Sequence, residues 1–544
     1  RTTNPLEVDP SQTTFIFVTP RSWPGAKEWV NNKKCMGPWR DVRAYDSSFL
    51  EQWIGICPAV GFWSATKLHK YPMKGVIALD DWWEKWKDST KPAISPVLLK
   101  AGRASQVEGI INWLNSGPCT ENVQAQTSDE AIAFLASVIS TMNESDMEYY
   151  FSRALVAENA DSFRHITATA KDDLILVADF ENLNFVDQAG KLHHVYIPKP
   201  PVYTENRKNV IELGYLAKRQ LIPALMEIGL TDEQSEKLAR DTGGSLSVLR
   251  RRLGNPQTPP EWAKPDTFME LIPVLFVESW NGEKIGDKQV LERLSNTKYD
   301  TFISQMKKWR LKQDSPILQM GPNKWRLVSP FDVFMTLFHT VSDETLMEFK
   351  KIVIDVFSTK DPSFDLGPEK RYMRSVVSDK YLYSDELRWG IAQTLVLIAV
   401  FGDKVPNGKI DSYSVQSWVD QIVRKLLKED KEELWYSVSD VLPLIAEASP
   451  GEFLSVVEES LNKMPSHIMI LFQENGSSLD SRIKCYSLIS AIESLAWDPS
   501  FIGQTTRILA KLESLNKDRK VASQLENSLK SILHIIHPST YAGP

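Results

Sequence analysis

The sequence lacks the residues with which a nucleotide-binding α/β domain holds phosphate. Such a domain places G-x-x-x-x-G-K-[ST] between a strand and a helix, where backbone N–H groups surround the phosphates and a lysine meets their charge. Here the Gly-Lys pairs occur as Gly190-Lys191-Leu192 and Gly408-Lys409-Ile410, and neither is followed by Ser or Thr. A phosphate loop of the usual kind is therefore excluded.

Other missing features bear on the cellular compartment of the protein and on whether it binds a metal. No run of about 18 apolar residues is present, so we expect no spanning helix and no membrane partner. The opening RTTNPLEVDP has no apolar core of a signal peptide. The four cysteines, Cys35, Cys57, Cys119 and Cys485, show no C-x-x-C spacing. This fits reduced thiols in a cytosol better than disulfides or a zinc site, so we expect a cytoplasmic chain without a bound metal.

The composition is that of a soluble globular protein. Hydrophobic residues make up 42% and charged residues 24% of the 544 residues. A chain of this length exceeds one hydrophobic core, and we expect about three or four domains. The formal net charge of −7 argues against nucleic-acid binding over the whole surface. Any such contact must be local, and DNA remains a candidate partner only on a basic patch.

Residues 97–262 predict an α/β core. Strands that alternate with helices are expected at residues 121–126, 153–159, 172–180 and 194–198. This alternation is typical of a parallel, doubly wound sheet that binds ligands at the carboxyl ends of its strands. The turn after the first strand reads Gln126-Thr127-Ser128-Asp129-Glu130. It places two carboxylates where a phosphate needs positive potential.

The pattern becomes helical after Asn209. Thr231 and Gln234 are expected to form a capping box at the start of one helix. Gly243-Gly244 is expected to end that helix, and Ser245 to cap the next. These helices read as a lid on the core.

Three features of the core resemble a known family. Gly102-Arg103, an apolar strand that ends in Asp179, and GGSLSVLRRRL (243–253) follow in this order. Together they resemble the lid-bearing core of STAND-type AAA+ ATPases. The resemblance implies that Arg103, Asp179 and Arg250 lie at a nucleotide site, with Asp179 in the place of a magnesium-holding Walker B residue. A strand-end cap is the alternative role for Asp179. Because the phosphate loop is missing, we expect a degenerate core.

Residues 1–72 predict strand, helix, strand and helix, with the strands at 13–20 and 39–46. A sheet of two strands leaves its edges and one face uncovered, so we expect partner strands upstream. Ser47 or Ser48 is expected to cap the second helix.

FIFVTPRSWPGAKEW and PWRDVRAYDSSFLEQWI, in this same segment, resemble the closing half of Mrr-like, PD-(D/E)xK-type restriction-endonuclease domains. These domains stand at the front of large bacterial anti-phage defence proteins. The resemblance implies that the catalytic residues, and any Mg²⁺ that serves them, belong to an upstream half before Arg1. No catalytic residue is expected within the chain itself. Asp41 and Asp46 lack a lysine partner on a neighbouring strand and are expected at the surface or as caps.

Residues 73–96 are expected to be a short helix and a linker. Trp82, Trp83 and Trp86 stand among charged residues there, and the segment ends in prolines that disfavour helix. Stacking on a nucleic-acid base is one use of these rings. An anchor at a domain interface is the other.

Residues 263–330 predict a winged-helix domain. Helices are expected at 285–295 and 299–312, followed by a hairpin at 317–328. One helix and the hairpin contribute five basic side chains that are expected to form a single phosphate-binding patch. These are Lys307, Lys308, Arg310, Lys324 and Arg326. The alternative is a solvated face on a module that packs against the core.

Residues 331–544 show helical periods only, separated by short Pro, Gly and Asp punctuation. Ser384 and Ser414 are plausible helix caps. The pattern predicts an α-solenoid of degenerate repeats. KDPSFDL, YSDELRWG and AEASPGEFL also resemble the helical region of the same bacterial defence proteins.

The expected fold is therefore multidomain α/β plus α. It comprises a partial restriction-endonuclease-like segment, a degenerate P-loop-like core with a helical lid, a winged helix and a C-terminal α-solenoid. The expected function is a sensor and scaffold that controls a nuclease effector through a pseudo-NTPase core. Its trigger would be a protein ligand, with a phage component as the candidate. A DNA-binding nuclease and an active ATPase are the alternatives, so the sequence leaves open whether the chain is an enzyme, and whether it oligomerises.

Overall fold

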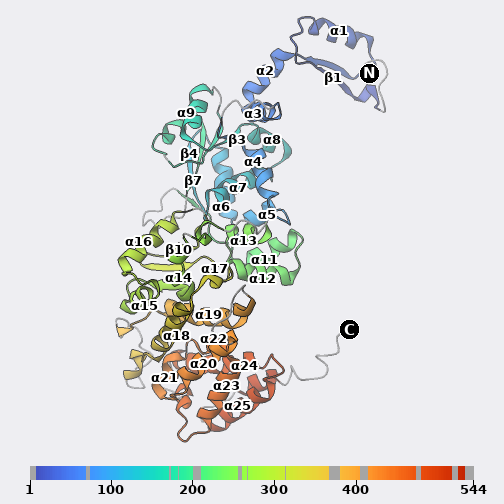
Figure 1. Ribbon diagram of the computed structural model, residues 1–544. Helices are drawn as coiled ribbons and strands as arrows, with labels where there is room; N and C mark the ends of the chain where they lie inside the picture. The colour runs from blue at the N-terminus through green and yellow to red at the C-terminus, as the bar shows by residue number, and fades with distance from the viewer. Residues whose placement is uncertain are drawn as a thin grey trace. The chain divides into compact units, whose positions relative to one another are not determined.

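The computed structural model describes most of the chain, and Figure 1 draws the remaining residues in grey. The described residues are 8–68, 74–170, 173–181, 183–199, 210–254, 260–265, 267–312, 314–366, 380–404, 414–472, 479–516 and 525–532. The chain divides into two compact units. Unit 1 comprises Arg1–Pro201, Glu205–Ala239 and Leu249–Asn255; unit 2 comprises Val202–Thr204, Arg240–Val248 and Pro256–Pro544. No described helix is both long and apolar enough to span a bilayer.

Unit 1 begins with a parallel pair of strands, β1 (Thr14–Val18) and β2 (Asp41–Tyr45). One face of the pair carries Phe15 and Phe17, whose rings lie 6.5 and 5.7 Å from the ring of Trp29. Trp29 belongs to α1 (Ala26–Met36), so this helix covers that face. Two helices follow, α2 (Ser47–Ile56) and α3 (Pro58–Lys67). The order of strands and helices agrees with the prediction.

Asp41 and Asp46 have the structural roles expected of them. Asp46, rather than Ser47 or Ser48, caps α2, because its carboxylate accepts from the N–H groups of Ser48 and Phe49. Asp41 lies beside Lys34, with its carboxylate 2.7 Å from the ammonium group. This contact and a second with Arg43 lower the pKa of Asp41 to about 2.

The other face of the β1–β2 pair is open to solvent. Ile16 and Val18 point to this face and remain 50% and 54% exposed. Among the described residues, β1 and β2 are the whole of this sheet. Parallel sheets are normally covered on both faces, because their strands are built from apolar residues. The described part of this domain is therefore an incomplete layer.

The main sheet of unit 1 has six strands in the order β3-β5-β6-β7-β4-β8. β3 is antiparallel to β5, and the other neighbouring pairs are parallel. The strands are β3 (Val76–Ala78), β4 (Thr120–Gln124), β5 (Ala154–Ala157), β6 (Ile175–Ala178), β7 (His194–Lys199) and β8 (Ile211–Glu212). The four predicted strands are all present. The two edge strands, β3 and β8, were not predicted, because they are too short to show a residue pattern typical of a strand.

Helices cover both faces of this sheet (Figure 1). Phe163 and Val186, from the helices on one face, share a buried cluster with Leu176 and Val195 of the central strands. On the other face Tyr196 donates its hydroxyl hydrogen to the carbonyl of an α7 residue at 2.6 Å. The helices are α4 (Leu79–Lys87), α5 (Pro96–Lys100), α6 (Ala104–Leu114), α7 (Ser128–Ile139), α8 (Glu144–Phe151), α9 (Ala160–Thr169) and α10 (Val186–Ala189).

Residues 76–87 are part of this layer, whereas residues 73–96 were expected to form a short helix and a linker. The helix is present as α4, but β3 precedes it and pairs with β5. Trp83 and Trp86 are buried, and Trp86 stacks with its neighbour Trp82 at 6.0 Å. The tryptophans therefore anchor α4 within the domain.

Three further helices follow, α11 (Lys218–Glu227), α12 (Asp232–Thr242) and α13 (Leu246–Leu253). The capping box at the start of α12 is confirmed, since Thr231 N donates to Gln234 Oε1 at 3.0 Å and Gln234 N to Thr231 Oγ1 at 3.3 Å. The expected end of α12 is also confirmed. Gly243 and Gly244 both adopt positive φ there, which a side chain disfavours.

Unit 2 contains a small α/β module and then helices. In the module, β10 (Ile317–Gln319), β11 (Lys324–Leu327) and β9 (Ser279–Asn281) form an antiparallel sheet in that order. Its helices are α14 (Ile272–Val277), α15 (Ile285–Ser295) and α16 (Tyr299–Arg310). Trp325 faces α16: it stacks on Trp280, whose ring lies 5.8 Å from that of Phe302. The predicted helices and hairpin are present, and β9 adds a third strand.

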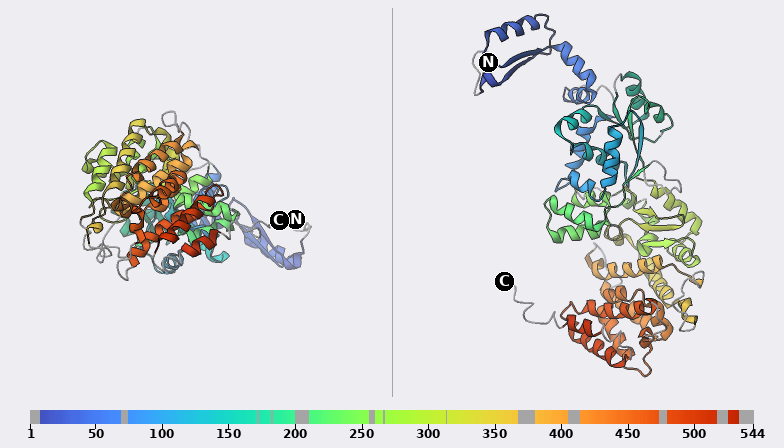
Figure 2. Two further views of the ribbon diagram at one scale, coloured as in Figure 1. Left: turned by 90° about the horizontal axis from the view of Figure 1, so that it is seen from below. Right: turned by 180° about the vertical axis from the view of Figure 1, so that it is seen from behind.

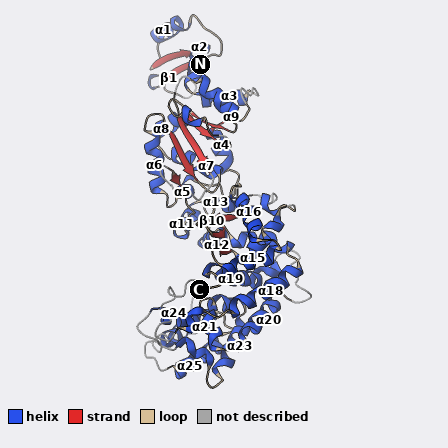
Figure 3. Cartoon of the chain, turned by 90° about the vertical axis from the view of Figure 1, so that its left-hand side faces the viewer, coloured by secondary structure: helices blue, strands red, loops and turns tan. Residues whose placement is uncertain are grey.

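The described residues from 330 onwards contain helices and no strand, as Figure 3 shows. In one row α19 packs on α22 and α22 on α24; in another α18 packs on α20, α20 on α23 and α23 on α25. Figure 2 shows this helical region, coloured from yellow to red, from two further sides. The serines predicted as caps, Ser384 and Ser414, start α19 and α20. The helices are α17 (Pro330–Leu337), α18 (Asp343–Ser358), α19 (Asp385–Phe401), α20 (Val415–Leu427), α21 (Glu432–Val438), α22 (Leu442–Ala448), α23 (Pro450–Leu461), α24 (Leu479–Leu495) and α25 (Ile502–Leu515).

Candidate functional site at the start of helix α7

The turn between β4 and α7 lies at the edge of the sheet where a ligand is expected. β4 to β8 are parallel, so their carboxyl ends share one edge, and Asp179 follows β6 at that edge. β4 lies inside the sheet, and the chain leaves it in the opposite direction from the chain that leaves its neighbour β7. Such a reversal opens a crevice at the carboxyl ends of the two strands.

The side chains of the turn already bind its own backbone N–H groups. Thr127 caps α7, and its Oγ1 accepts from the N–H of Glu130 at 3.0 Å. The carboxylate of Glu130 in turn accepts from the N–H of Gln126 at 3.3 Å. This is close to a capping box, in which a cap residue and the third residue of the helix satisfy each other. Two donors of the kind that would bind a phosphate are thereby occupied.

A buried ion pair fills the space beside the turn. Arg103 donates through Nη2 to Oε1 of Glu130 at 2.5 Å, and the two side chains are 4% and 2% exposed. Arg103 also donates to the carbonyl oxygens of Leu99 at 3.1 Å and Gly214 at 2.7 Å. A buried charge is tolerated when it is paired and hydrogen-bonded in this way. The Glu130 carboxylate therefore compensates the buried charge of Arg103.

Arg250 of α13 makes a similar contact one residue earlier in the turn. Its Nη1 lies 3.3 Å from Oδ2 of Asp129, and its Nη2 donates to the hydroxyl of Ser89 at 3.2 Å. The guanidinium also lies over the ring of Trp86, 4.2 Å from its centre. The side chains of Arg250 and Asp129 are 27% and 41% exposed, so water screens this pair more than the Arg103–Glu130 pair.

Asp179 bonds to the remaining residue of the turn. Burial raises the pKa of Asp179, its hydrogen bond with Ser128 lowers it, and the nearby carboxylates of Asp129 and Glu158 raise it. The net effect is a pKa above the ordinary value. The described residues contain no group of three metal-ligating side chains, at Asp179 or elsewhere.

The three residues that the resemblance singled out thus converge on one turn. Arg103, Asp179 and Arg250 each contact a different residue among Ser128, Asp129 and Glu130. The sequence indicated the three outer residues but not their partners within the turn. Thr127-x-x-Glu130 was the available signal, because it has the spacing of a capping box. The part played by Trp86 under Arg250 had no signal in the sequence.

The five basic residues of the module in unit 2 do not form one patch. Lys307 and Lys308 are exposed on α16. Arg310 bonds to Gln319 on β10. Lys324 and Arg326 alternate with Trp325 along β11, so they point away from the face that α16 covers.

Lys324 instead meets the helical region. Its ammonium lies 2.5 Å from the carboxylate of Glu386 on α19, and this contact raises its pKa. Ser279, which pairs with Arg326 across the sheet, donates to the carbonyl oxygen of the same glutamate at 2.8 Å. The second face of this sheet therefore packs against α19. Lys307 and Lys308 on α16 are exposed, and Lys324 stays 53% exposed while it is paired with Glu386.

A cavity of about 260 Å³ lies at the opposite edge of the main sheet, near the amino ends of β5, β6 and β7. Its wall includes His194, whose Nδ1 lies 2.9 Å from the carboxylate of Asp173. Nε2 of the same ring faces the carbonyl oxygen of Ser116 at 3.1 Å, and the hydroxyl of Ser116 donates to Trp113 O. The hydroxyl is thus not aligned with the base, and the arrangement does not activate a nucleophile.

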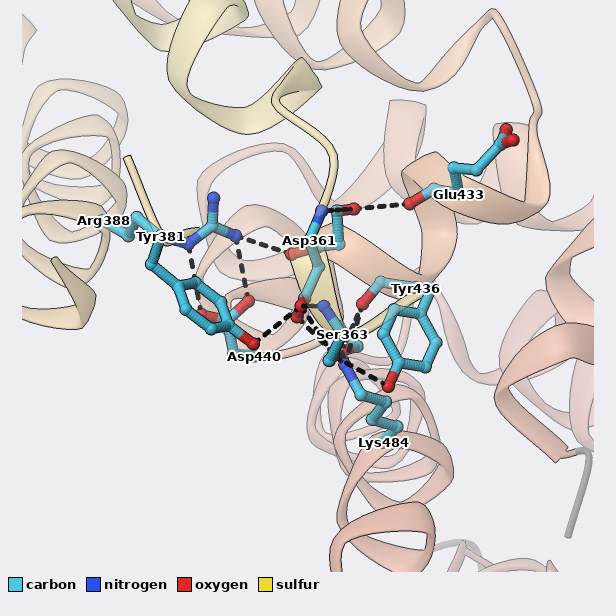
Figure 4. A network of polar contacts seen from close by, with 10 residues as sticks. Asp361, Ser363, Tyr381, Arg388, Glu433, Tyr436, Asp440 and Lys484 are labelled. Atoms are coloured by element: carbon cyan, nitrogen blue, oxygen red, sulfur yellow. Dashed lines mark hydrogen bonds and ion pairs between the residues drawn. The ribbon is translucent and has the colours of Figure 1, made fainter. Parts of the chain in front are cut away.

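The helices of unit 2 enclose a polar network, shown in Figure 4. Asp361 accepts from Ser363 N at 2.8 Å, Ser363 Oγ at 2.6 Å and Tyr381 Oη at 2.7 Å. Burial opposes ionisation of Asp361, but the charge of Lys484 and these bonds outweigh it, so its pKa lies below the ordinary value. The adjoining cavity of about 30 Å³ has room for about one water molecule.

Arg388 and Lys484 complete this network. Arg388 donates to Asp440 Oδ1 at 3.1 Å and to the carbonyl oxygen of Ser437 at 2.6 Å. Lys484 donates to Tyr436 O at 3.0 Å, and its ammonium lies 3.6 Å from the centre of the Tyr436 ring. These residues come from α19, α21 and α24 and the segments beside them. The network therefore joins helices that are distant in sequence.

Comparison of the chain with protein-family models, with curated proteins and with solved structures finds no match. The proposals below rest on the residues themselves.

Proposed function

We propose that the chain is the sensor and scaffold of a bacterial anti-phage defence protein, and that its core controls a nuclease effector without using a nucleotide. The observation that carries the proposal is the buried Arg103–Glu130 pair. The Glu130 carboxylate, fixed at the start of α7, repels a triphosphate. If this carboxylate moved away from Arg103, the buried charge of the arginine would be unpaired. The crevice is therefore better suited to packing than to phosphate chemistry.

The order of the strands supports a STAND-like origin for this core. Numbered along the chain from β4 to β8, the parallel strands lie in the order 5-1-4-3-2 across the sheet. This order puts a topological switch at the carboxyl end of the first strand, where an α/β domain binds its ligand. In a nucleotide-binding core the first strand leads to the phosphate loop and the third to the Walker B aspartate, which are the places of Thr127 and Asp179 here. We propose that the core kept this architecture and lost its chemistry.

The open face of the β1–β2 pair supports an effector that is completed by further strands. Ile16 and Val18 are exposed on that face, and a parallel sheet of two strands is not stable alone. We propose that this pair belongs to a nuclease domain of the Mrr-like type. Any Mg²⁺ and the catalytic carboxylates would then belong to the completing strands, since the described residues provide no metal-ligating group.

The two rows of helices support a ligand-binding role for unit 2. Paired rows are the arrangement of α-solenoids, which present extended surfaces to protein ligands. We propose that such a protein, with a phage component as candidate, is the trigger. The module before these helices has the element order of a winged helix, and its sheet is tied to α19 by Lys324 and Ser279. This packing favours a structural role for most of the module.

A protection assay in bacteria tests the proposal. Cells that express the complete coding sequence containing this chain are challenged with phage, and plating efficiency is measured for wild type and for Asp179→Asn. The proposal predicts equal protection, because Asp179 holds no magnesium in the working protein. Loss of protection in Asp179→Asn, with normal protein levels, would contradict it and favour an active ATPase.

DNA contact through α16 is the second candidate, because Lys307 and Lys308 are exposed on one helix. If they grip phosphates, Lys307→Glu/Lys308→Glu weakens binding to duplex DNA and reduces its dependence on salt. Lys425→Glu/Lys428→Glu on and beside α20 makes the same change of charge at exposed positions and is the control. Equal mobility shifts for the two variants would exclude α16 as the grip.

A further inference from the structure

Arg250 and Arg103 are both held by carboxylates from successive positions of one turn. Asp129 is the second residue of α7 and Glu130 the third. The N-terminus of a helix attracts anions through its free N–H groups and its dipole, and guanidinium groups pair with carboxylates and phosphates through the same forked donors. The start of α7 with its two arginines is thus an oxyanion site whose occupants belong to the chain.

A second observation at this place is a buried donor without an acceptor. Arg103 is 3% exposed, and its Nε–H is buried without an acceptor among the described residues. At this site Glu130 pairs with Arg103 and Asp129 pairs with Arg250, and the carboxylate of Asp179 also bonds to the turn. Removal of the Asp129 carboxylate takes this anionic partner away from the Arg250 guanidinium beside the helix N-terminus.

We propose that Asp129 stands in for a phosphate oxyanion and latches Arg250 of α13 to the start of α7. This latch rests on the proposed function, in which no nucleotide occupies the crevice. The Asp129–Arg250 pair would keep the crevice closed. Trp86 and Ser89 position the guanidinium, and the Asp129 carboxylate supplies the charge. The pair is partly exposed, so it can open in solution, whereas the buried Arg103–Glu130 pair stays fixed. The latch is therefore the movable part of the site.

The chain offers a matched control for a test. Asp161 is also the second residue of its helix, α9, and it also lies 3.3 Å from the Nη1 of an arginine, Arg164. Asp161→Asn and Asp129→Asn therefore make the same chemical change at equivalent helix positions in one domain. Only Asp129→Asn removes the carboxylate that holds Arg250.

Thermal unfolding and hydrogen exchange of the full chain are measured in sodium phosphate and in sodium chloride of equal ionic strength. Asp129→Asn is expected to gain stability from phosphate, with a dissociation constant on the order of 1 mM or tighter. In chloride the amides of residues 249–253 in this variant should exchange about fivefold faster than in wild type, the effect of losing a partly exposed pair. Wild type and Asp161→Asn should show neither effect, and adding Arg250→Gln to Asp129→Asn should abolish the phosphate effect.

The latch is overturned if phosphate acts equally on Asp129→Asn and Asp161→Asn, or if exchange of residues 249–253 is unchanged. Such a result leaves the nucleotide-free core standing. Micromolar binding of MgATP to wild type would instead remove the proposed function, whatever the variants do.

Discussion

Replacement of Glu130 by glutamine should destabilise unit 1 more than any exposed substitution. Glu130 is 2% exposed and is the acidic partner of Arg103, whose other hydrogen bonds go to the carbonyl oxygens of Leu99 and Gly214. Breaking a buried ion pair by removing one partner costs about 3–5 kcal/mol, because the remaining charge is buried without compensation. The amides of α7 should then exchange roughly 100- to 4,000-fold faster in the native state, the same free energy expressed as an opening constant.

Asp146→Asn is the control for this change. Asp146 is the third residue of α8, as Glu130 is of α7, and it also bonds to its helix cap, but it is exposed. Asp146→Asn should change the exchange rate of the α7 amides by no more than about fivefold. The double variant Arg103→Met/Glu130→Leu should recover most of the lost stability, because apolar residues of similar volume replace a buried pair well. If Glu130→Gln and Asp146→Asn have equal small effects, the pair does not close the site.

Two further predictions concern unit 2. Burial raises the pKa of Asp287 to about 6, so the native state binds a proton that the unfolded state releases near pH 3.8. The free energy of unfolding is therefore highest below pH 3.8 and falls by about 3 kcal/mol in all as the pH rises to 6. Asp287→Asn should remove this pH dependence, which is measured by urea unfolding at a series of pH values. Gly390→Ala should disrupt the contact of α19 with α14, since a Cβ there would lie 1.8 Å from the Val277 carbonyl oxygen. Gly451→Ala, where the Cβ meets nothing within 4 Å, should instead raise the free energy of unfolding by up to about 1 kcal/mol.

The sequence predicted the elements of the core better than it predicted their contacts. The spacing of apolar residues and the helix caps are local features. The capping roles of Thr127 in α7 and of Thr231 and Gln234 in α12 can therefore be inferred from their sequence neighbours alone. β3 has three residues, which is too few for a periodic pattern to identify. Short edge strands depend on pairing with distant residues, and propensity says little about them.

The site was predicted in part for the same reason. Arg103, Asp179 and Arg250 were singled out through a resemblance in their order along the chain, and the structure brings all three to one turn. The basic patch failed as a single surface because alternation along β11 sends Lys324 and Arg326 to the face that α19 covers. That face has no partner until the helices of unit 2 are folded. The pairing of Lys324 with Glu386, 62 residues further along the chain, depends on the fold and not on a local pattern.

The central claim is that carboxylates of the turn have replaced the phosphate of a nucleotide. Equilibrium dialysis of the full chain against ATP with and without Mg²⁺ tests it most directly. The account predicts no saturable binding at millimolar ATP in either condition. Saturable, magnesium-dependent binding with a micromolar dissociation constant, abolished by Asp179→Asn, would contradict it.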